Sequence, residues 1–294
     1  MPGPVVHQRR YTDTVTRMGA AWVGRWLARR ARRHLDDGLP QLAIFGFEHV
    51  GRAVTVWGRY ERDELALLHE ALQAQGLWQR DGLCLDIGAN IGNHALFFAP
   101  LCKTVWAFEP NPRTFTLLQL NATLAGNVRC FNLGLSDKAG QATLSVPADN
   151  IGMATLQPGA PGAPGAAVVC ELQRLDDLPE LAAQRVVLVK IDVEGHEAAA
   201  LRGAVATLRR DRPVVVFEQL PGEIDAQGDS PTLAVLREAG YHRWWTLEQR
   251  PAGGASRLGN LLRRLLFGEV QCLVECTRLA PRFHAMVVAL PDGA

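Results

Sequence analysis

A short apolar run that ends in a glycine turn is the first feature of the chain with chemical meaning. The run at 83–87 leads into Gly88 and Gly92, which allow a tight turn and a close approach of the backbone to a ligand. In an open α/β sheet, ligands bind beyond the carboxyl ends of the strands, where this turn is expected. The spacing is G-x-x-x-G rather than the G-x-G-x-x-G of a dinucleotide site, which disfavours a nicotinamide cofactor.

An acidic residue follows at the distance expected for a contact with a ribose. Glu109 lies 21 residues after Gly88, at the end of the apolar run 104–108. A carboxylate at this place can accept hydrogen bonds from both hydroxyls of a ribose diol. The alternative is that Asp86 and Glu109 simply end their strands and face solvent. Their combined spacing and strand order favour the ligand-binding interpretation.

A second group of polar residues follows the apolar run 186–191 and could activate an acceptor. Asp192, Glu194 and His196 are expected at the same carboxyl edge of the sheet. An alcohol acceptor needs a base that removes its proton, and the ordinary pKa of histidine suits this role for His196 at neutral pH. Asp192 would orient His196 or bind the acceptor hydroxyl. In the alternative, Asp192 caps the following helix while Glu194 complements its dipole.

A metal site is the next alternative for these residues. Glu218 follows the apolar run 213–217, so Asp192, Glu218 and His196 would come close if the two strands are neighbours. Oxygen-rich clusters of this kind can hold Mg²⁺, which would acidify an acceptor hydroxyl. Nothing in the spacing requires a metal, and we predict a site without one.

Strand and helix patterns alternate along the chain and indicate its fold class. Uninterrupted apolar runs at 83–87, 104–108, 127–133, 186–191 and 213–217 are typical of strands covered on both faces. Helical patterns lie between or after them at about 92–101, 112–125, 197–209 and 230–239, with further strands expected at 141–146, 166–172 and 284–290. This alternation predicts an α/β fold with a doubly wound, mostly parallel sheet.

The N-terminal segment reads differently and is predicted to be a basic extension covering residues 1–54, ahead of a single domain at 55–294. Its first 34 residues hold eight arginines and one acid, Asp13. Residues 20–35 have the pattern of an amphipathic helix, 41–60 are expected to be extended, and 61–75 to form a helix that ends at Gly76. Within the domain, an amphipathic insertion is predicted at 251–275.

The sequence contains two amphipathic stretches whose binding partners it does not identify. The helix at 20–35 and the leucine stripe at 257–267 could lie on an anionic membrane surface or hold a lipid-linked or phosphorylated sugar. The alternative is that both apolar faces pack against the domain or a second subunit, as such stripes usually do. Trp244 and Trp245 could likewise stack on a sugar or an aromatic acceptor, or lie in the core.

Composition and charge exclude several classes of protein. The 294 residues carry a net charge of +1, which argues against a nucleic-acid binder. No signal peptide is evident, and no uncharged apolar stretch approaches the roughly 18 residues of a membrane span. The six cysteines form no CxxC pair, and Cys84, Cys130 and Cys170 fall in strand-like runs. We therefore expect a reduced, cytoplasmic protein without a zinc site, at most peripherally attached to a membrane.

Four motifs, taken in order, resemble those of the FkbM family of S-adenosylmethionine-dependent methyltransferases. They are D-I-G-A-N-I-G at 86–92, A-F-E-P-N-P at 107–112, L-S-D at 135–137 and K-I-D-V-E-G-H-E at 190–197. The resemblance covers about residues 55–247, with a weaker echo at 284–291. It implies the seven-strand Rossmann-like methyltransferase fold, S-adenosylmethionine as methyl donor, and transfer usually to oxygen.

The resemblance also implies roles for individual residues. Those around the methionine part of the donor would be Asp86, Gly88, Asn90 and Gly92, those at the ribose Glu109 with its neighbour Asn111, and those near the adenine Ser136 and Asp137. The function implied is O-methylation of a hydroxyl on a sugar, glycolipid or natural product, so the partner would be a small-molecule, saccharide or lipid-linked acceptor. A homo-oligomer is an open alternative. Two other functions remain open: an NAD-dependent oxidoreductase with a variant glycine loop, and a non-catalytic module that binds S-adenosylmethionine.

Overall fold

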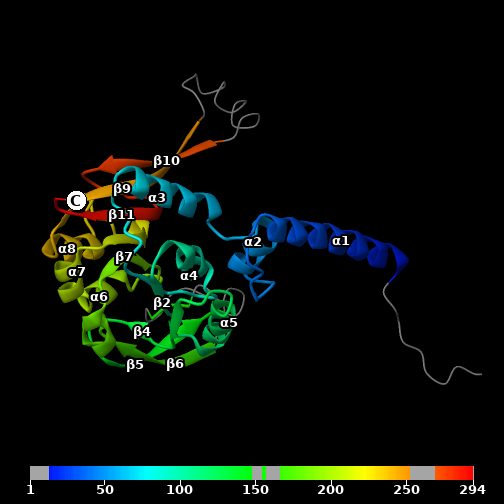
Figure 1. Cartoon of the computed structure of the whole chain (residues 1–294), viewed down its shortest axis with the longest axis horizontal. Coiled ribbons are helices and arrows are strands. Elements are labelled where there is room, and N and C mark those ends of the chain that lie inside the picture. Colours follow the sequence, from blue (N-terminus) through cyan, green and yellow to red (C-terminus); the bar gives the residue numbers. More distant parts are fainter. Residues whose placement is uncertain (1–12, 148–153, 157–165, 252–268, 294) are drawn as a thin grey trace, which may run out of the picture.

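The computed structural model describes residues 13–147, 154–156, 166–251 and 269–293. Its centre is a sheet of eight strands in the order β10-β9-β11-β8-β7-β1-β2-β3 (Figure 1). The bounds are β1 Leu83–Ile87, β2 Thr104–Phe108, β3 Val128–Phe131, β7 Val186–Ile191, β8 Val214–Gln219, β9 Tyr241–Pro251, β10 Glu269–Cys276 and β11 His284–Pro291. The five strands from β3 to β8 pair in parallel, whereas β11, β9 and β10 add antiparallel strands at one edge.

Helices cover both faces of the sheet, which explains the uninterrupted apolar runs. On one face, buried apolar residues of α3 (Arg62–Ala74), α4 (Asn93–Phe98) and α5 (Pro112–Ala122) join one core cluster. On the other face, α6 (Glu197–Arg202), α7 (Val205–Asp211) and α8 (Pro231–Glu238) complete a second cluster. This confirms the predicted Rossmann-like α/β fold: seven strands have the expected arrangement, and β10 extends the sheet by one.

A second, smaller sheet lies at one end of the large sheet (Figure 1). It has the order β4-β6-β5, formed by β4 Gly134–Leu135, β5 Gly140–Val146 and β6 Ala166–Gln173. Short 3₁₀ helices also occur, at Ala99–Leu101, Leu175–Asp177, Pro179–Ala183 and Pro221–Glu223. The predicted strands at 141–146 and 166–172 are therefore confirmed, but as a separate sheet.

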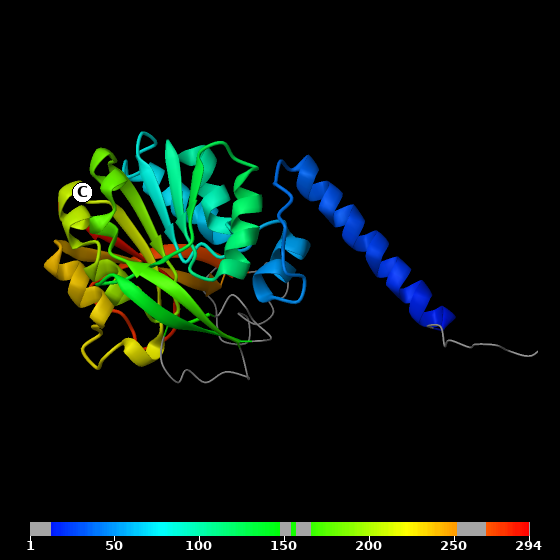
Figure 2. The same cartoon turned by 90° about the horizontal axis from the view of Figure 1, so that it is seen from below.

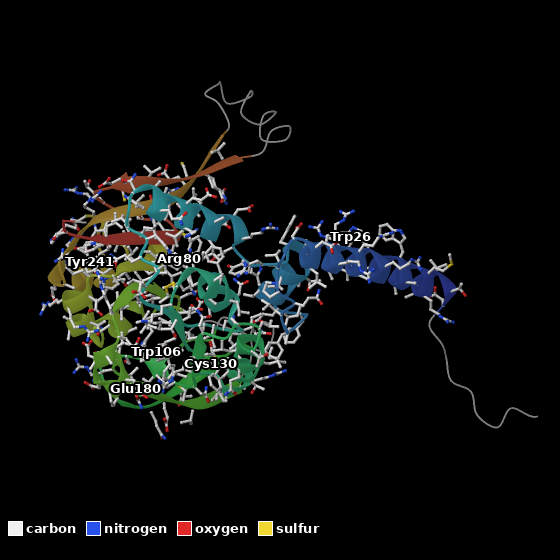
Figure 3. All side chains as sticks on the ribbon, in the orientation of Figure 1. Trp26, Arg80, Trp106, Cys130, Glu180 and Tyr241 are labelled. Atoms are coloured by element: carbon white, nitrogen blue, oxygen red, sulfur yellow. A yellow bond between two sulfur atoms is a disulfide. The ribbon has the colours of Figure 1, made fainter. Side chains whose placement is uncertain are left out.

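The N-terminal segment forms two helices, of which the first projects away from the body of the protein (Figure 2). Helix α1 spans Thr14–Asp36 and starts at Asp13, whose side chain accepts a hydrogen bond from the Thr16 amide. The predicted amphipathic helix is thus confirmed and is longer than expected. In the described part of the chain its apolar side chains are mostly exposed, as the sticks in Figure 3 indicate.

The extended structure expected at 41–60 is wrong over its second half, because His49–Trp57 forms helix α2. The β-branched run Ala53–Trp57 has a high strand propensity, but burial of Val54 and tight packing of the helix decide the outcome. A Cβ at Gly51 would lie 2.1 Å from the Phe45 carbonyl oxygen. Gly58, at φ 81°, ends the helix in the left-handed conformation that glycine favours. The predicted domain boundary after residue 54 falls inside α2 and stays a prediction.

At the other end of the chain, β9 and β10 were not expected. Trp244 and Trp245 lie in β9 and are buried, so they belong to the core rather than to a sugar site. Strand β10 occupies the last residues of the predicted insertion at 251–275, whereas the leucine stripe at 257–267 lies outside the described residues.

The cysteines also differ from expectation, because Cys84 and Cys102 form a disulfide. Cys84 lies on β1 and Cys102 just before β2, so the parallel pairing of these strands brings the two residues together. Cys130, Cys170, Cys272 and Cys276 are free. The prediction of a fully reduced chain is wrong for the first pair, and the cytoplasmic location that rested on it stays a prediction. None of the described helices has both the length and the apolar character needed to cross a bilayer.

Candidate active site

A cavity of about 560 Å³ opens at the carboxyl ends of β1, β2, β7 and β8. Among the residues singled out in the sequence, it is lined by Gly88, Asn90, Glu109, Asp192, Glu194 and His196. These come from three loops that the parallel strands bring to one edge. Five other residues singled out in the sequence do not line the cavity: Asp86, Gly92, Asn111, Ser136 and Asp137.

The glycine turn has the conformation that its sequence requires. Gly88 has φ 78°, and its amide and that of Ala89 donate to the Phe108 carbonyl oxygen. A Cβ at Gly88 would lie 1.8 Å from the carbonyl oxygen of Asp192, so only glycine fits between the two loops. Asn90 also has a positive φ, 49°, and its side-chain oxygen is buried and accepts no hydrogen bond in the described structure.

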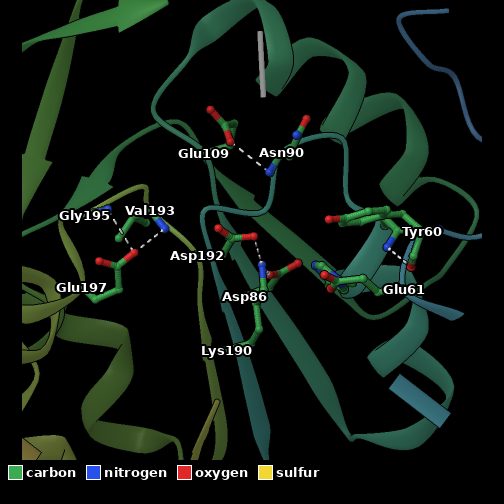
Figure 4. A network of polar contacts seen from close by, with 12 residues as sticks. Tyr60, Glu61, Asp86, Asn90, Glu109, Lys190, Asp192, Val193, Gly195 and Glu197 are labelled. Atoms are coloured by element: carbon green, nitrogen blue, oxygen red, sulfur yellow. Dashed lines mark hydrogen bonds and ion pairs between the residues drawn. The ribbon is translucent and has the colours of Figure 1, made fainter. Parts of the chain in front are cut away.

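Glu109 closes the turn from the neighbouring strand. Its two carboxylate oxygens accept hydrogen bonds from the backbone amides of Asn90 (2.9 Å) and Asn111 (2.8 Å), the first of which is drawn in Figure 4. The side chain is 7% exposed, and burial raises its pKa to about 7, against the effect of these two amides. The neighbouring carboxylates of Asp86 and Glu48 contribute to this rise.

Asn111 and Gly92 have local structural roles at the ends of the adjoining helices. Asn111 caps α5 through a hydrogen bond from the Arg113 amide to its side-chain oxygen, with Pro112 in the first turn. Gly92 precedes α4 at φ 89°. One further cavity-lining residue, Thr114 in α5, was not expected, and its hydroxyl is buried without a hydrogen-bond partner in the described part of the chain.

A buried lysine organises the floor of the site. Lys190 places its Nζ 3.6 Å from Asp86 Oδ1 and 3.3 Å from Asp192 Oδ2, as Figure 4 shows. Burial alone would lower the pKa of Lys190, but the carboxylates of Asp192, Asp86 and Glu61 outweigh it and raise the pKa. Asp86 is fully buried and lies behind the cavity wall, so its predicted contact with a ligand stays a prediction. The sequence signal for Lys190 was a single charge in an otherwise apolar strand.

The loop after β7 supplies the opposite wall. His196 Nε2 lies 3.0 Å from Ser136 Oγ, which ties the loop to the end of β4. Burial lowers the pKa of His196, and the charge of Arg202 adds to this while Asp137 opposes it. The imidazole is therefore neutral at neutral pH. Ser136 thus contacts this histidine, and Asp137 lies 3.7 Å from Arg202; the expected place of Ser136 and Asp137 near an adenine stays a prediction.

Two glutamates beside His196 titrate near neutral pH. The pKa of Glu194 is raised to about 7 and that of Glu218 to about 8, chiefly by burial, and the charge of Asp192 contributes to both shifts. Glu218 ends β8 next to β7, as the sequence suggested, and lines the cavity. Among the described residues, however, no group of three His, Cys, Asp or Glu side chains could hold a metal ion, so the alternative of Mg²⁺ at Asp192, Glu218 and His196 finds no support.

The segment before α3 completes the cavity in a way that the sequence did not indicate. His49 and Tyr60 line the cavity and also a second cleft of about 710 Å³ between α1, α2 and α3. The Tyr60 backbone is fixed by a pair of hydrogen bonds with the Asn93 side chain. Burial and the neighbouring carboxylates, Glu61 first, raise the Tyr60 pKa well above its usual value. The two hollows therefore adjoin at His49 and Tyr60.

The chain is similar to known methyltransferases. A family model described as the methyltransferase FkbM domain matches residues 86–243. Hexuronic acid methyltransferase AglP of Haloferax volcanii is 33% identical over 165 residues, which are 54% of this chain and 62% of that protein. The 2-O-methyltransferase NoeI of Sinorhizobium fredii is 26% identical over 173 residues, 53% of this chain and 70% of that protein.

A third relative and one solved structure complete the comparison. Methyltransferase sdnD of Sordaria araneosa is 33% identical over 154 residues, 40% of this chain and 59% of that protein. The chain thus spans less than two thirds of the length of AglP and of sdnD. The crystal structure of a methyltransferase FkbM from Methylobacillus flagellatus KT aligns with a TM-score of 0.39 at 16% identity, covering 90% of this chain and 60% of that one.

Proposed function

Because the chain belongs to the FkbM methyltransferase family, we propose that it transfers the methyl group of S-adenosylmethionine to a hydroxyl oxygen of a sugar or natural product. The donor supplies a methyl group on a positively charged sulfur, which is already activated for transfer. What the protein must add is alignment of the acceptor with that methyl group and removal of the acceptor's proton. One observation carries the proposal: the cavity is lined at once by the Gly88 turn with Glu109 and by the Asp192–His196 loop.

The residues of the first wall fit a nucleoside with an amino-acid tail. A carboxylate offers about four lone-pair positions, and Glu109 uses two of them on backbone amides. The remaining positions suit the two hydroxyls of a ribose. Asn90 and Thr114 also line the cavity, and their side-chain oxygens are buried without a hydrogen-bond partner in the described structure. We assign the donor to this wall, with Gly88 allowing its close approach.

On the second wall, we propose His196 as the base for the acceptor hydroxyl. Its imidazole is neutral because burial lowers its pKa. If Nε2–H donates to Ser136 Oγ, the lone pair of Nδ1 is left to accept a proton. Asp192, held by Lys190, and Glu194 then bind or orient the acceptor. Glu218, with a pKa of about 8, lies on the same cavity as a second residue able to exchange a proton near neutral pH.

An acceptor with several hydroxyl groups is consistent with this polar wall. The names of AglP and NoeI, a hexuronic acid methyltransferase and a 2-O-methyltransferase, support a saccharide acceptor and transfer to oxygen. We therefore place a saccharide, free or lipid-linked, ahead of other hydroxylated molecules.

Isothermal titration calorimetry with S-adenosylhomocysteine, the product form of the donor, tests the donor half directly. We expect binding of S-adenosylhomocysteine and no binding of NADH under the same conditions. Binding of NADH alone would overturn the proposal in favour of an oxidoreductase. The acceptor half is tested with radiolabelled donor and a set of free hexuronic acids and neutral sugars. Label recovered as a methyl ether is the expected product, and label on nitrogen would contradict transfer to oxygen.

A further inference from the structure

Helix α1 carries an apolar stripe that nothing in the described part of the chain covers. Val15, Met18 and Trp22 are 80%, 67% and 60% exposed, and Val23 and Trp26 follow at 47% and 37%. At helical spacing, Val15, Met18, Trp22 and Trp26 share one side of the helix. Figure 3 shows Trp26 on the helix where it projects from the body of the protein. Of the face expected from sequence to pack against the domain, Leu27 and Ala31 are partly buried, whereas Trp22, Val23 and Leu35 are exposed.

The charges of the same helix are strongly one-sided. Between residues 14 and 36 there are six arginines and a single acid, Asp36. By helical spacing, Arg25 lies at the edge of the apolar stripe, and Arg29, three residues after Trp26 and seven after Trp22, continues the same side of the helix beyond it. Long arginine side chains at that position can keep the charged group in water while their stems cover apolar surface. Helix α1 thus combines exposed tryptophan with flanking positive charge.

We propose that α1 binds the surface of an anionic membrane, with Val15, Met18, Trp22 and Trp26 in the boundary between headgroups and acyl chains. Charge complementarity selects this occupant. A second copy of the chain would bring two strongly positive helices together, which costs energy, whereas anionic headgroups attract each arginine. The apolar stripe between the charges matches a helix that lies in the plane of the interface.

The connection of α1 to the rest of the chain gives this anchor a consequence for the active site. Arg30 holds the two N-terminal helices together: its Nε donates to the Val56 carbonyl oxygen at 2.8 Å, and its guanidinium lies 5.3 Å from the centre of the Trp57 ring. Helix α2 in turn lines the cavity through His49 and Arg52. An anchored α1 would therefore hold the cavity within reach of the membrane surface, where a lipid-linked acceptor is found.

Co-sedimentation with vesicles tests the anchor without knowledge of the acceptor. The full chain is mixed with vesicles of phosphatidylcholine containing roughly 30% phosphatidylglycerol, and with vesicles of phosphatidylcholine alone. We expect binding to the anionic vesicles that weakens as salt is raised from about 0.1 M to about 0.5 M. A protein that stays in the supernatant with anionic vesicles would overturn the proposal.

Paired variants separate the apolar from the electrostatic contribution. Met18→Ser with Trp22→Ser should reduce vesicle binding at least roughly tenfold, because apolar burial is lost. Leu120→Ser with Leu124→Ser, on exposed leucines at the end of α5, is the matched control and should bind as the wild type does. Equal binding by all three proteins would contradict a role for α1. Circular dichroism establishes that each variant is folded before its binding is compared.

The charge variants use Arg25 and Arg29, which have no partner among the contacts described for them. Replacing both by Gln should weaken binding roughly fivefold for each charge removed, whereas replacing both by Lys should preserve it. Size-exclusion chromatography with light scattering examines the competing occupant. A dimer that Met18→Ser with Trp22→Ser dissociates would show that the stripe serves a second copy, and would overturn the membrane proposal. Binding of S-adenosylhomocysteine should be the same in every variant, so failure of the anchor is distinguishable from failure of the proposed function.

Discussion

The affinity for S-adenosylhomocysteine should depend on pH through Glu109. Burial raises the pKa of this carboxyl from 4.5 to about 7. The charged form accepts hydrogen bonds from ribose hydroxyls, whereas the protonated form has given up one acceptor position. With a pKa near 7, about a tenth of the Glu109 side chains are ionised at pH 6 and about nine tenths at pH 8. If only the ionised form makes the full contact, affinity should rise nearly tenfold across this interval.

Calorimetric titrations at several pH values between these limits measure the effect, and Glu109 variants assign it. Glu109→Ala should weaken binding by about 1–3 kcal/mol at pH 8, because the ribose loses a charged acceptor. It should also remove most of the pH dependence, whereas the matched control Glu180→Gln, an exposed residue paired with Arg129, should retain it. Glu194 and Glu218 titrate in the same range, so a pH dependence that survives in Glu109→Ala would refute the assignment to Glu109.

The same carboxyl makes a prediction about stability with the opposite trend. Its folded-state pKa lies above its unfolded value, so the folded protein binds the proton more tightly. The contribution of Glu109 to the free energy of unfolding is therefore most favourable below about pH 4.5 and is lost as pH rises toward 7. Affinity for the donor product increases over the upper part of this range while the contribution to stability falls. Denaturant titrations of the wild type and of Glu109→Gln, each at about pH 4.5 and at about pH 7, measure how the free energy of unfolding changes with pH in the two proteins.

Three further variants probe the rest of the site and its support. His196→Ala should lower turnover far more than affinity for S-adenosylhomocysteine, and near-normal turnover in a methyl-transfer assay would reject it as the base. Lys190→Met should lower the free energy of unfolding in urea by about 3–5 kcal/mol, because it leaves buried carboxylates without their cation; Lys103→Met, on an exposed lysine, should cost far less. Replacing Cys84 and Cys102 together by Ala should lower the free energy of unfolding by about 3 kcal/mol. Mass spectrometry of the wild type after alkylation should find neither of these two cysteines alkylated, because they form a disulfide.

The central strands were predictable because two-sided burial leaves a direct mark on sequence. The five parallel strands are short and mostly apolar, with a single charged residue in β1, β3, β7 and β8. The helices between them begin at recognisable signals such as Asn111 with Pro112. Strands β9 and β10 lie at the antiparallel edge of the sheet and are long and mixed in polarity. Such strands leave a weaker pattern.

Helix α2 and the disulfide escaped prediction for a different physical reason, because both are decided by packing between segments. Residues 53–57 favour a strand locally, but they form a helix whose Val54 is buried, whose Gly51 packs against Phe45 and whose end is the turn at Gly58. Cys84 and Cys102 are separated by a helix, and nothing in their spacing shows that β1 and β2 bring them together. Local propensity is a weak guide where tertiary contacts oppose it.

Site residues that directly follow the end of a strand were predictable from sequence. Site residues that lie within a strand or come from another segment were not. The sequence placed Gly88, Glu109 and Asp192 at one edge, and the cavity includes all three. It did not predict Tyr60, which reaches the same cavity from the segment before α3. Nor did it predict Lys190, whose importance depends on register: β1 and β7 pair residue 86 with 190, which sets the lysine beside a buried aspartate.

The packing of Gly88 against Asp192 means that the two walls of the cavity are not independent. The backbone turn that we assign to the donor packs against the backbone of Asp192, whose carboxylate we assign to the acceptor. The contact leaves no room for a methyl group, because a Cβ at Gly88 would overlap the Asp192 carbonyl oxygen. The Asp192 amide also donates to the Ile87 carbonyl oxygen at 2.9 Å, which locks the loops in register. Any shift of the turn must therefore move Asp192. If donor and acceptor bind as we propose, this junction of β1 and β7 sets where they stand relative to each other, and the loop that carries His196 starts from it.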